Sequence, residues 1–281
     1  MFPKDLVVFL ESDGQHARRL EFAVGLAKRW QAHLIATFVA RRPLDSDPNA
    51  VLAVGDVVEA MMATYRSQVA QSAARARNDF DALCDRRSFS SEWRLSEDEE
   101  GEALVLHARH ASLAVLGPPS AQRETPVPFG LSEKMLFASG RPCLLLPDGW
   151  PVDAGTGHRI VIGWNGSREA TRSIAAAMPF LVQADSVHLV VAPRAPRGSG
   201  AYGQDPGADM AEHLARQGVP VVVDSSEAAD AGGLLIQRCA TVDADLLVMG
   251  AKGRSRISEF VFGGATQTVF ATASLPLFVA A

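Results

Sequence analysis

The segment GAKGRSRISEFVFGGAT, residues 250–266, follows an apolar run and leads into a helical pattern. Gly250 and Gly253 lack a Cβ, so the backbone there can turn sharply and come close to a ligand. Gly263 and Gly264 stand at the start of the helix, where unpaired N–H groups and the helix dipole favour an anion. A strand, a glycine-rich loop and a helix in this order predict an α/β fold with a loop suited to holding phosphates.

Three further residues of this segment carry groups that suit a phosphate. Thr266 can add a hydroxyl at the start of the helix, and Lys252 and Arg254 can supply positive charge. The alternative interpretation is a plain strand–loop–helix turn in which both cations are solvated loop charges. The segment alone leaves both interpretations open.

The chain contains an internal repeat. The apolar runs DLVVFL, residues 5–10, and RIVIGW, residues 159–164, each have the length and branched side chains of a buried parallel strand. An Ala-rich amphipathic segment and a second apolar run follow each of them. The closing runs LAVLG, residues 113–117, and LLVMG, residues 246–250, also match. Strands that alternate with helical segments predict a parallel sheet with helices on both faces.

The repeat divides the chain into two domains, which we place at residues 1–147 and 158–281. The segment between them, Pro147 to Gly157, holds Pro, Gly and Asp without apolar periodicity. The first domain is longer because of a helix-forming stretch, Val51 to Arg86. The Gly- and Pro-rich residues 193–207 are assigned no structure.

The glycine spacing resembles that of a known family. Gly, two residues, Gly, nine residues, Gly is similar to the nucleotide-binding signature of the universal stress protein family, and the resemblance covers nearly the whole chain, once per half. It implies two tandem α/β domains, each an open five-stranded parallel sheet of strand order 3-2-1-4-5 with helices on both faces. Ligands of such sheets bind beyond the strand carboxyl ends, where the strand order reverses.

The resemblance also implies a set of nucleotide-contacting positions in the second half. They lie at the ends of three strands, in the glycine loop and at the start of the last helix. They are Gly163, Asn165, Val191, Met249, Gly250, Lys252, Gly253, Arg254, Gly263, Gly264, Ala265 and Thr266.

Two residues of the second half depart from the family pattern. Nucleotide-binding members end the first strand with an acidic residue that holds the ribose, whereas this chain has Asn165, which accepts a hydrogen bond but carries no charge. The family usually has Ser or Thr after the third motif glycine, whereas this chain has Gly264. The run Asn165-Gly166-Ser167 also suits a tight turn without any ligand.

The first half departs further. Its equivalent segment keeps the spacing but reads Gly117-Pro118-Pro119-Ser120, nine residues, Gly130. Ser120 replaces a glycine, and the two prolines remove backbone N–H donors from the loop. Glu11 stands at the place of the acidic residue. We therefore expect no nucleotide, or a much weaker site, in the first half.

Composition limits the classes of protein that fit. Hydrophobic residues make up 47% of the chain and charged residues 21%, which is typical of a soluble globular protein. The formal net charge is −5 and no stripe of Lys and Arg occurs, so we expect no nucleic-acid binding. No apolar run is long enough to cross a membrane, and the N-terminus lacks a signal-peptide pattern. The distant cysteines Cys84, Cys143 and Cys239 form no disulfide or metal motif, which indicates a reducing, cytoplasmic location.

We expect neither a metal centre nor a catalytic set. His107 and His110 are three residues apart, but no third ligand joins them at a suitable spacing. The acidic run at residues 97–100 is interpreted as a helix start. The chain has no GxSxG, HExxH or Walker loop, so we do not expect an enzyme.

The favoured hypothesis is a stress-response protein that binds ATP or a related nucleotide in its second domain, with magnesium as an optional accompanying ion. The alternatives are a nucleotide-free interaction scaffold and a weak ATPase. The resemblance further implies that two such domains pair through their last strands, here residues 144–146 and 277–279. The tandem could thus form a pseudo-dimer within one chain, which would cover two exposed sheet edges, and two chains could pair further as a homodimer.

Overall fold

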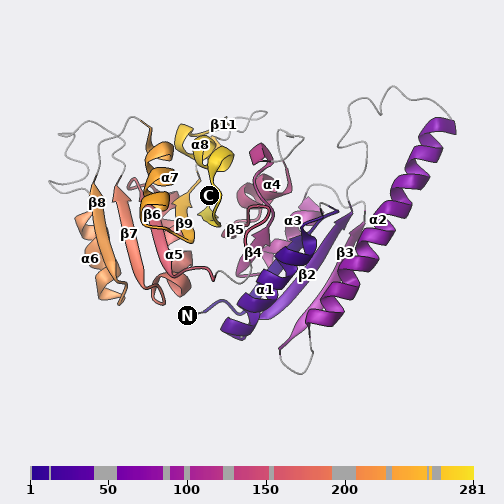
Figure 1. Cartoon of the computed structure of the whole chain (residues 1–281), viewed down its shortest axis with the longest axis horizontal. Helices are drawn as coiled ribbons and strands as arrows, with labels where there is room; N and C mark the ends of the chain where they lie inside the picture. The colour runs from indigo at the N-terminus through magenta and orange to yellow at the C-terminus, as the bar shows by residue number, and fades with distance from the viewer. Residues whose placement is uncertain are drawn as a thin grey trace. The chain divides into compact units, whose positions relative to one another are not determined.

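The computed structural model shows an α/β fold that divides into two compact units, Phe2–Gly117 and Pro118–Ala281 (Figure 1). Each unit consists of β-strands and the helices that connect them. The residues that the structure describes are 2–12, 14–40, 56–84, 89–97, 102–122, 130–151, 155–191, 207–225, 230–251, 253–254 and 261–281.

In the part of the unit Phe2–Gly117 that the structure describes, four parallel strands lie in the order β3-β2-β1-β4. They are β1 (Asp5–Leu10), β2 (His33–Ala40), β3 (Ser91–Glu97) and β4 (Leu113–Leu116). The helices are α1 (His16–Trp30), α2 (Asp56–Leu83) and α3 (Glu102–Arg109). Strands β1 and β4 are buried almost along their whole length, as continuous apolar runs in a parallel sheet should be.

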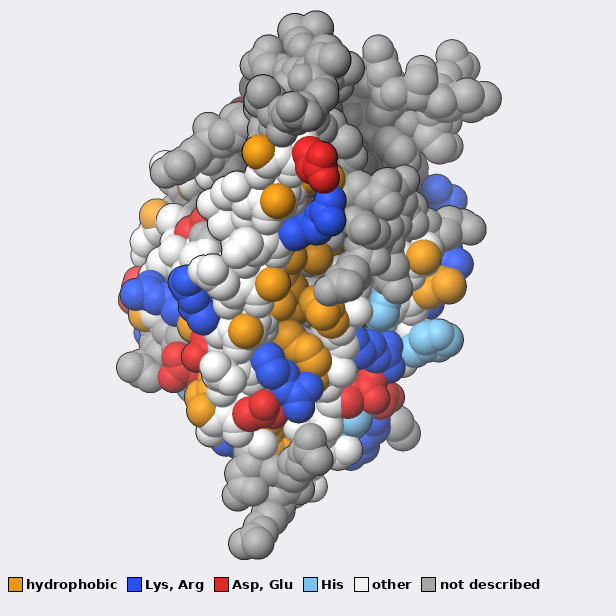
Figure 2. Space-filling view, turned by 90° about the vertical axis from the view of Figure 1, so that its right-hand side faces the viewer, with side chains coloured by type: hydrophobic (Ala, Val, Ile, Leu, Met, Phe, Trp, Pro, Cys, Tyr) orange, Lys and Arg blue, Asp and Glu red, His pale blue; other side chains and the backbone are white. Residues whose placement is uncertain are grey.

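Helix α2 confirms the helix that was predicted within Val51 to Arg86, for the part that is described. The acidic run was interpreted wrongly at its first residue, because Glu97 ends strand β3 and helix α3 begins at Glu102. Residues 98–101 lie outside the described residues. In this unit the exposed leucines Leu95 and Leu106 are 45% and 46% exposed. Figure 2 shows hydrophobic side chains interspersed with charged ones, as on most protein surfaces.

In the described residues of the unit Pro118–Ala281, the main sheet has six strands in the order β5-β12-β9-β6-β7-β8. They are β5 (Cys143–Leu145), β6 (Arg159–Trp164), β7 (Ser186–Val191), β8 (Val221–Ser225), β9 (Leu246–Gly250) and β12 (Leu277–Ala280). The helices are α4 (Leu131–Ala138), α5 (Arg168–Leu181), α6 (Ala208–Arg216), α7 (Ala231–Thr241) and α8 (Gly264–Thr272), with the short 3-10 helix η3 (Ser120–Gln122).

The second repeat therefore has the predicted strand order. Counted from residue 158, its third, second, first, fourth and fifth strands lie side by side and parallel, as β8, β7, β6, β9 and β12. Helices α5 and α6 cover one face of this sheet, and α7 and α8 cover the other (Figure 1), as right-handed crossovers require. The first repeat shows the same order for its first four strands.

Helix α4 and strand β5 come from the end of the first repeat, but they group with the second repeat. Strand β5 runs antiparallel to β12, with Cys143 opposite Val279 and Leu145 opposite Leu277. The domain limits at residues 147 and 158 remain predictions from the repeat. One carboxylate does fix the start of the second repeat, since Asp245 accepts the backbone N–H groups of Gly157 at 2.7 Å and His158 at 3.0 Å.

The cysteines Cys84, Cys143 and Cys239 are buried and unpaired. Burial raises the pKa of all three thiols, and that of Cys239 reaches about 12. They act as small hydrophobic side chains, as their apolar surroundings predicted for Cys143 and Cys239. Among the described residues, no helix is long and apolar enough to cross a lipid bilayer.

Candidate functional site

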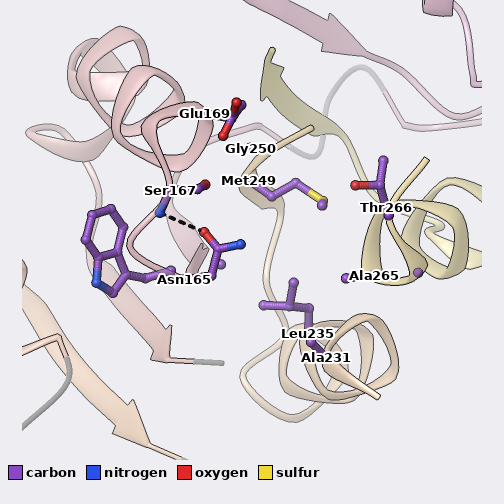
Figure 3. Close-up of a pocket in the computed structure, with 13 residues that line it drawn as sticks. Asn165, Ser167, Glu169, Ala231, Leu235, Met249, Gly250, Ala265 and Thr266 are labelled. Atoms are coloured by element: carbon purple, nitrogen blue, oxygen red, sulfur yellow. Dashed lines mark hydrogen bonds between the residues drawn. The ribbon is translucent and has the colours of Figure 1, made fainter. Parts of the chain in front are cut away.

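The order of the strands reverses at β6, which lies between β7 and β9. Chain connections leave β6 and β9 in opposite directions, so the carboxyl ends of these two strands flank a crevice. In register, Gly163 of β6 pairs with Met249 of β9, and Trp164 pairs with Val191 of β7. A cavity of about 290 Å³ opens beyond these strand ends (Figure 3).

Three helices complete the wall of this cavity with their first turns: α5, α7 and α8. Most of the residues that the sequence predicted for nucleotide contact line it, and several other residues join them. The lining consists of Gly163, Trp164, Asn165, Ser167, Glu169, Ala231, Leu235, Met249, Gly250, Gly263, Gly264, Ala265 and Thr266.

The start of helix α8 is the part of the lining that best suits an anion. Gly263 is its N-cap in an extended conformation, with φ −67° and ψ 150°, and no side chain caps it. A Cβ added at Gly263 or Gly264 would meet no atom within 4 Å. Thr266 is only 4% exposed, and Figure 3 shows its hydroxyl directed into the cavity. Backbone N–H groups, a helix dipole and one hydroxyl therefore meet at an open space.

Gly250 is required for a reason that the sequence did not predict. A Cβ at this position would lie 2.4 Å from the backbone nitrogen of Ala170 and 2.5 Å from the carbonyl carbon of Glu169. Glycine thus lets the first turn of α5 pack directly against the end of β9. Whatever ligand the cavity takes, this glycine is needed for the packing of the domain.

Asn165 forms the tight turn that was the alternative to ligand contact. Its side-chain oxygen accepts the backbone N–H of Ser167 at 3.1 Å, and Gly166 has a φ of +68°. The Ser167 hydroxyl then caps α5 by accepting the N–H of Ala170 at 3.2 Å. Because the oxygen of Asn165 serves the turn, the group it turns toward the cavity is the amide nitrogen (Figure 3). Asn165 thus accepts a hydrogen bond, as predicted, from its own turn, and its contact with a ligand stays a prediction.

Glu169 is one of the lining residues that sequence reasoning missed. It lies in the first turn of α5 and its side chain is 8% exposed, with Oε1 2.8 Å from Nε of Arg168. Its place two residues after the turn at residues 165–167 could have pointed to it. Ala231 and Leu235, from α7, had no comparable signal, because their segment precedes β9 and carries no motif.

The remaining predicted positions are Val191, Lys252, Gly253 and Arg254, and of these the described side chain of Val191 does not line the cavity. Val191 is buried at the end of β7. Gly253 and Arg254 form the short strand β10 (Gly253–Arg254), which pairs antiparallel with β11 (Val261–Phe262), where the sequence had predicted only a loop. Lys252 lies outside the described residues.

The corresponding place at the start of α4 is filled by the protein itself. Glu133, three residues after Gly130 as Thr266 is after Gly263, is 3% exposed. Its carboxylate accepts the backbone N–H of Ser120 at 2.7 Å and the Ser120 hydroxyl at 2.8 Å. A Cβ at Gly130 would lie 2.1 Å from that hydroxyl oxygen. The sequence predicted a weak or absent site here from Ser120 and the prolines, and Glu133 adds a reason that it missed.

In the unit Phe2–Gly117, the end of β4 is also covered. Arg19 is 3% exposed and donates to the carbonyl oxygen of Phe9 at 3.1 Å. A Cβ at Gly117 would lie 2.5 Å from its Nη2 atom. The first repeat therefore packs a guanidinium against the glycine that corresponds to Gly250. Among the described residues of both units, no group of three or more His, Cys, Asp or Glu could hold a metal ion.

The second repeat thus has the architecture of an open-sheet α/β domain with a cavity at its switch point. Residues 157–281 match the model of the universal stress protein family. The match covers the repeat that carries the cavity, and this is the family whose glycine spacing the segment resembles. No curated protein matches the chain in sequence.

Solved structures resemble the whole chain in fold. A universal stress protein from Archaeoglobus fulgidus DSM 4304 aligns with a TM-score of 0.68 at 15% identity, over 98% of this chain and 95% of that one. A putative universal stress protein from Pseudomonas aeruginosa UCBPP-PA14 aligns with a TM-score of 0.62 at 16% identity, over 99% and 93%. At such identities the likeness establishes the fold and leaves the ligand to the site itself.

Proposed function

We propose that the second repeat binds a mononucleotide, ATP or a close relative, and that the chain serves the stress response as a cytoplasmic nucleotide-binding module. The observation that carries this proposal is the cavity at the start of α8, where Gly263 and Gly264 present backbone without side chains. Its volume, about 290 Å³, is close to the lower end of the range for small-molecule sites.

The rest of the lining divides into two chemical kinds. Leu235, Met249 and Ala231 offer an apolar surface that suits a base or a ribose face. The amide of Asn165 and the hydroxyl of Thr266 offer polar contacts on two sides of that surface. A nucleotide has this division too, with an apolar ring at one end and an anionic group at the other.

Isothermal titration calorimetry with ATP and with AMP tests the proposal. Gly264→Val should abolish binding, because the valine side chain would take up space at the start of α8, where an added Cβ meets no atom within 4 Å. Gly25→Val is the matched control, since Gly25 also has open space at its Cβ but lies in α1, far along the chain from the cavity. Equal affinity in a folded Gly264→Val variant would refute the site.

The same purified protein distinguishes this proposal from two alternative functions, a nucleotide-free scaffold and a weak ATPase. A nucleotide-free scaffold predicts no heat of binding and no thermal shift with any nucleotide. A weak ATPase predicts phosphate release that Gly264→Val abolishes.

We also propose that the two repeats pair as a pseudo-dimer within one chain. The antiparallel contact of β5 with β12 supports this, because it joins the last strand of the first repeat to the last strand of the second. Such a contact leaves neither strand as an open edge. Sedimentation analysis, which would give one chain per particle or two, tests whether a homodimer adds to it.

A further inference from the structure

Helix α7 forms one wall of the cavity. Its residues Ala231 and Leu235 line the cavity, and Figure 3 shows both on the same side of it. Leu235 packs directly against the end of β6, because a Cβ added at Gly163 would lie 2.9 Å from its Cδ1 atom. A small displacement of α7 would therefore move Leu235 and change the width of the apolar part of the cavity.

The composition of α7 gives it few contacts that would hold it in place. Its first turn contains Gly232 and Gly233, and glycine is among the weakest helix formers. Its buried residues are Gly232, Leu235 and Cys239, and of these three only Leu235 is a large apolar side chain. Helices in proteins are stabilised mainly by the packing of an apolar face, so the position of α7 depends on further contacts.

Different contacts hold the two ends of α7. At its start, a Cβ added at Gly232 would lie 2.6 Å from the Cβ of Thr268 and 2.9 Å from the carbonyl oxygen of Ala265, so α7 packs closely against α8 there. Toward its end, Arg238 forms an ion pair with Asp224 of strand β8, with Nε 2.7 Å from Oδ2 and Nη2 in contact with Oδ1. The guanidinium thus binds both carboxylate oxygens, which fixes the direction of the contact as well as its length.

The carboxylate of Asp224 is itself held on the sheet. His188 of β7 lies with Nδ1 3.1 Å from Oδ2 of Asp224. The side chains of Asp224 and Arg238 are 20% and 30% exposed. By contrast, the ion pair of Glu212 and Arg216 on α6 has side chains that are 69% and 61% exposed. Water screens the pair on β8 and α7 less, so this pair can hold two elements together where the exposed one contributes little.

We propose, on the basis of the nucleotide-binding function above, that Arg238 and Asp224 are positioning residues for the apolar wall of the site. Their ion pair sets the distance of α7 from the ends of β6 and β9, and so how closely Leu235 meets the base of the nucleotide. Neither Arg238 nor Asp224 is part of the described lining, so both act through α7. The glycines at the start of α8, where the phosphates are placed, belong to a different part of the lining. The pair therefore affects the base and leaves the phosphates.

The test compares ATP with inorganic tripolyphosphate, which lacks the base, in wild type, Arg238→Gln, Asp224→Asn and Arg216→Gln. Arg216→Gln is the matched control, because it removes an exposed ion pair on α6. By calorimetry, the affinity for ATP should fall about tenfold in Arg238→Gln and in Asp224→Asn, and should change by about threefold or less in the control. The rise in Tm that millimolar tripolyphosphate causes, taken from the ligand-free Tm of each protein, should be the same in all of them.

Each contrary result is distinct. If both folded variants keep the wild-type affinity for ATP, the positioning role is overturned while nucleotide binding stands. If they weaken tripolyphosphate binding as much as ATP binding, the pair supports the whole domain, which also overturns the role. A wild type that binds ATP but does not respond to tripolyphosphate would overturn the separation of base and phosphate parts. If wild type binds no ATP, although circular dichroism shows it folded, the proposed function fails and this inference with it.

Discussion

The starts of helices α4 and α8 differ in what occupies the space in front of them. Both follow a motif glycine, Gly130 or Gly263, and both place a buried side chain three residues later. In α4 that residue is Glu133, whose carboxylate takes hydrogen bonds from Ser120 and fills the space. In α8 it is Thr266, and a cavity remains. The space in front of a helix N-terminus in this fold can thus be occupied by side chains of the protein or left open.

The first helix of each repeat shows a related difference. Counted from the first strand, Arg19 of α1 and Ser173 of α5 occupy equivalent positions. Arg19 lays its guanidinium against Gly117. Ser173 is small, donates to the carbonyl oxygen of Met249 at 2.8 Å and accepts the N–H of Ala280 at 2.8 Å. The small residue lets the α5 backbone approach Gly250 directly, which leaves the adjacent space open.

The largest expected effect comes from Gly250→Val, which would break the close approach of α5 to β9. Because the contact is with backbone atoms, the structure cannot relieve it by a rotamer change, and we expect a loss of about 3 kcal/mol or more in the free energy of unfolding. Urea denaturation measures it. Gly263→Val, with open space at its Cβ, should cost about 1 kcal/mol or less. Equal stability of the two variants would contradict the packing role.

Glu133→Ala should have the next largest effect. It leaves the buried N–H and hydroxyl of Ser120 without this acceptor, which costs about 2 kcal/mol of stability. Inorganic phosphate should restore part of this loss by occupying the vacated position, which thermal unfolding at rising phosphate concentration would detect. Thr266→Ala serves as the counterpart in the second repeat, with a smaller loss. A fully stable Glu133→Ala variant would show that the carboxylate is incidental.

Gly264→Ser tests the comparison of the two helix starts by changing α8 in the second repeat. It supplies the hydroxyl that the family pattern usually has at this position, and the added atoms meet no neighbour within 4 Å at the Cβ. One hydrogen bond to a charged phosphate should raise the affinity for ATP by about tenfold. Calorimetry decides it, and unchanged or lower affinity would place the phosphates elsewhere.

Ser120→Gly should have the smallest effect on ligand binding. It restores the glycine that the motif lacks in the first repeat, but Glu133 still stands at the start of α4 and Pro118 and Pro119 still lack N–H groups. The stoichiometry of ATP binding should therefore remain at one per chain. A second binding event would show that Ser120 alone closes the first repeat.

The sequence predicted the elements well because buried parallel strands are continuous apolar runs. The apolar run at residues 159–164 forms β6 with the predicted bounds, and the helical pattern expected after the glycine-rich loop is α8. The strand order came from the family resemblance and from no feature of the runs themselves. The hairpin of β10 and β11 was missed, since strands of two residues have no periodicity to detect.

The candidate site was predicted in part. Glycines and the strand ends could be placed because their spacing determines where the backbone turns. The roles of Glu133 and Glu169 could not be placed, because each depends on which side chain comes to lie against a loop or a strand end in the folded chain. Asn165 shows the same limit, since its oxygen could serve the turn or a ligand and only the folded geometry distinguishes them.

The contact between β5 and β12 has a practical consequence through Cys143. Its sulfur is fully buried where Cys143 faces Val279 across the strand pair, and burial raises its pKa so that little reactive thiolate exists at neutral pH. An alkylating reagent can therefore modify it only after the two strands separate. With Cys84 and Cys239 changed to serine or alanine, alkylation would be confined to Cys143. Its rate would then measure how fast strands β5 and β12 separate.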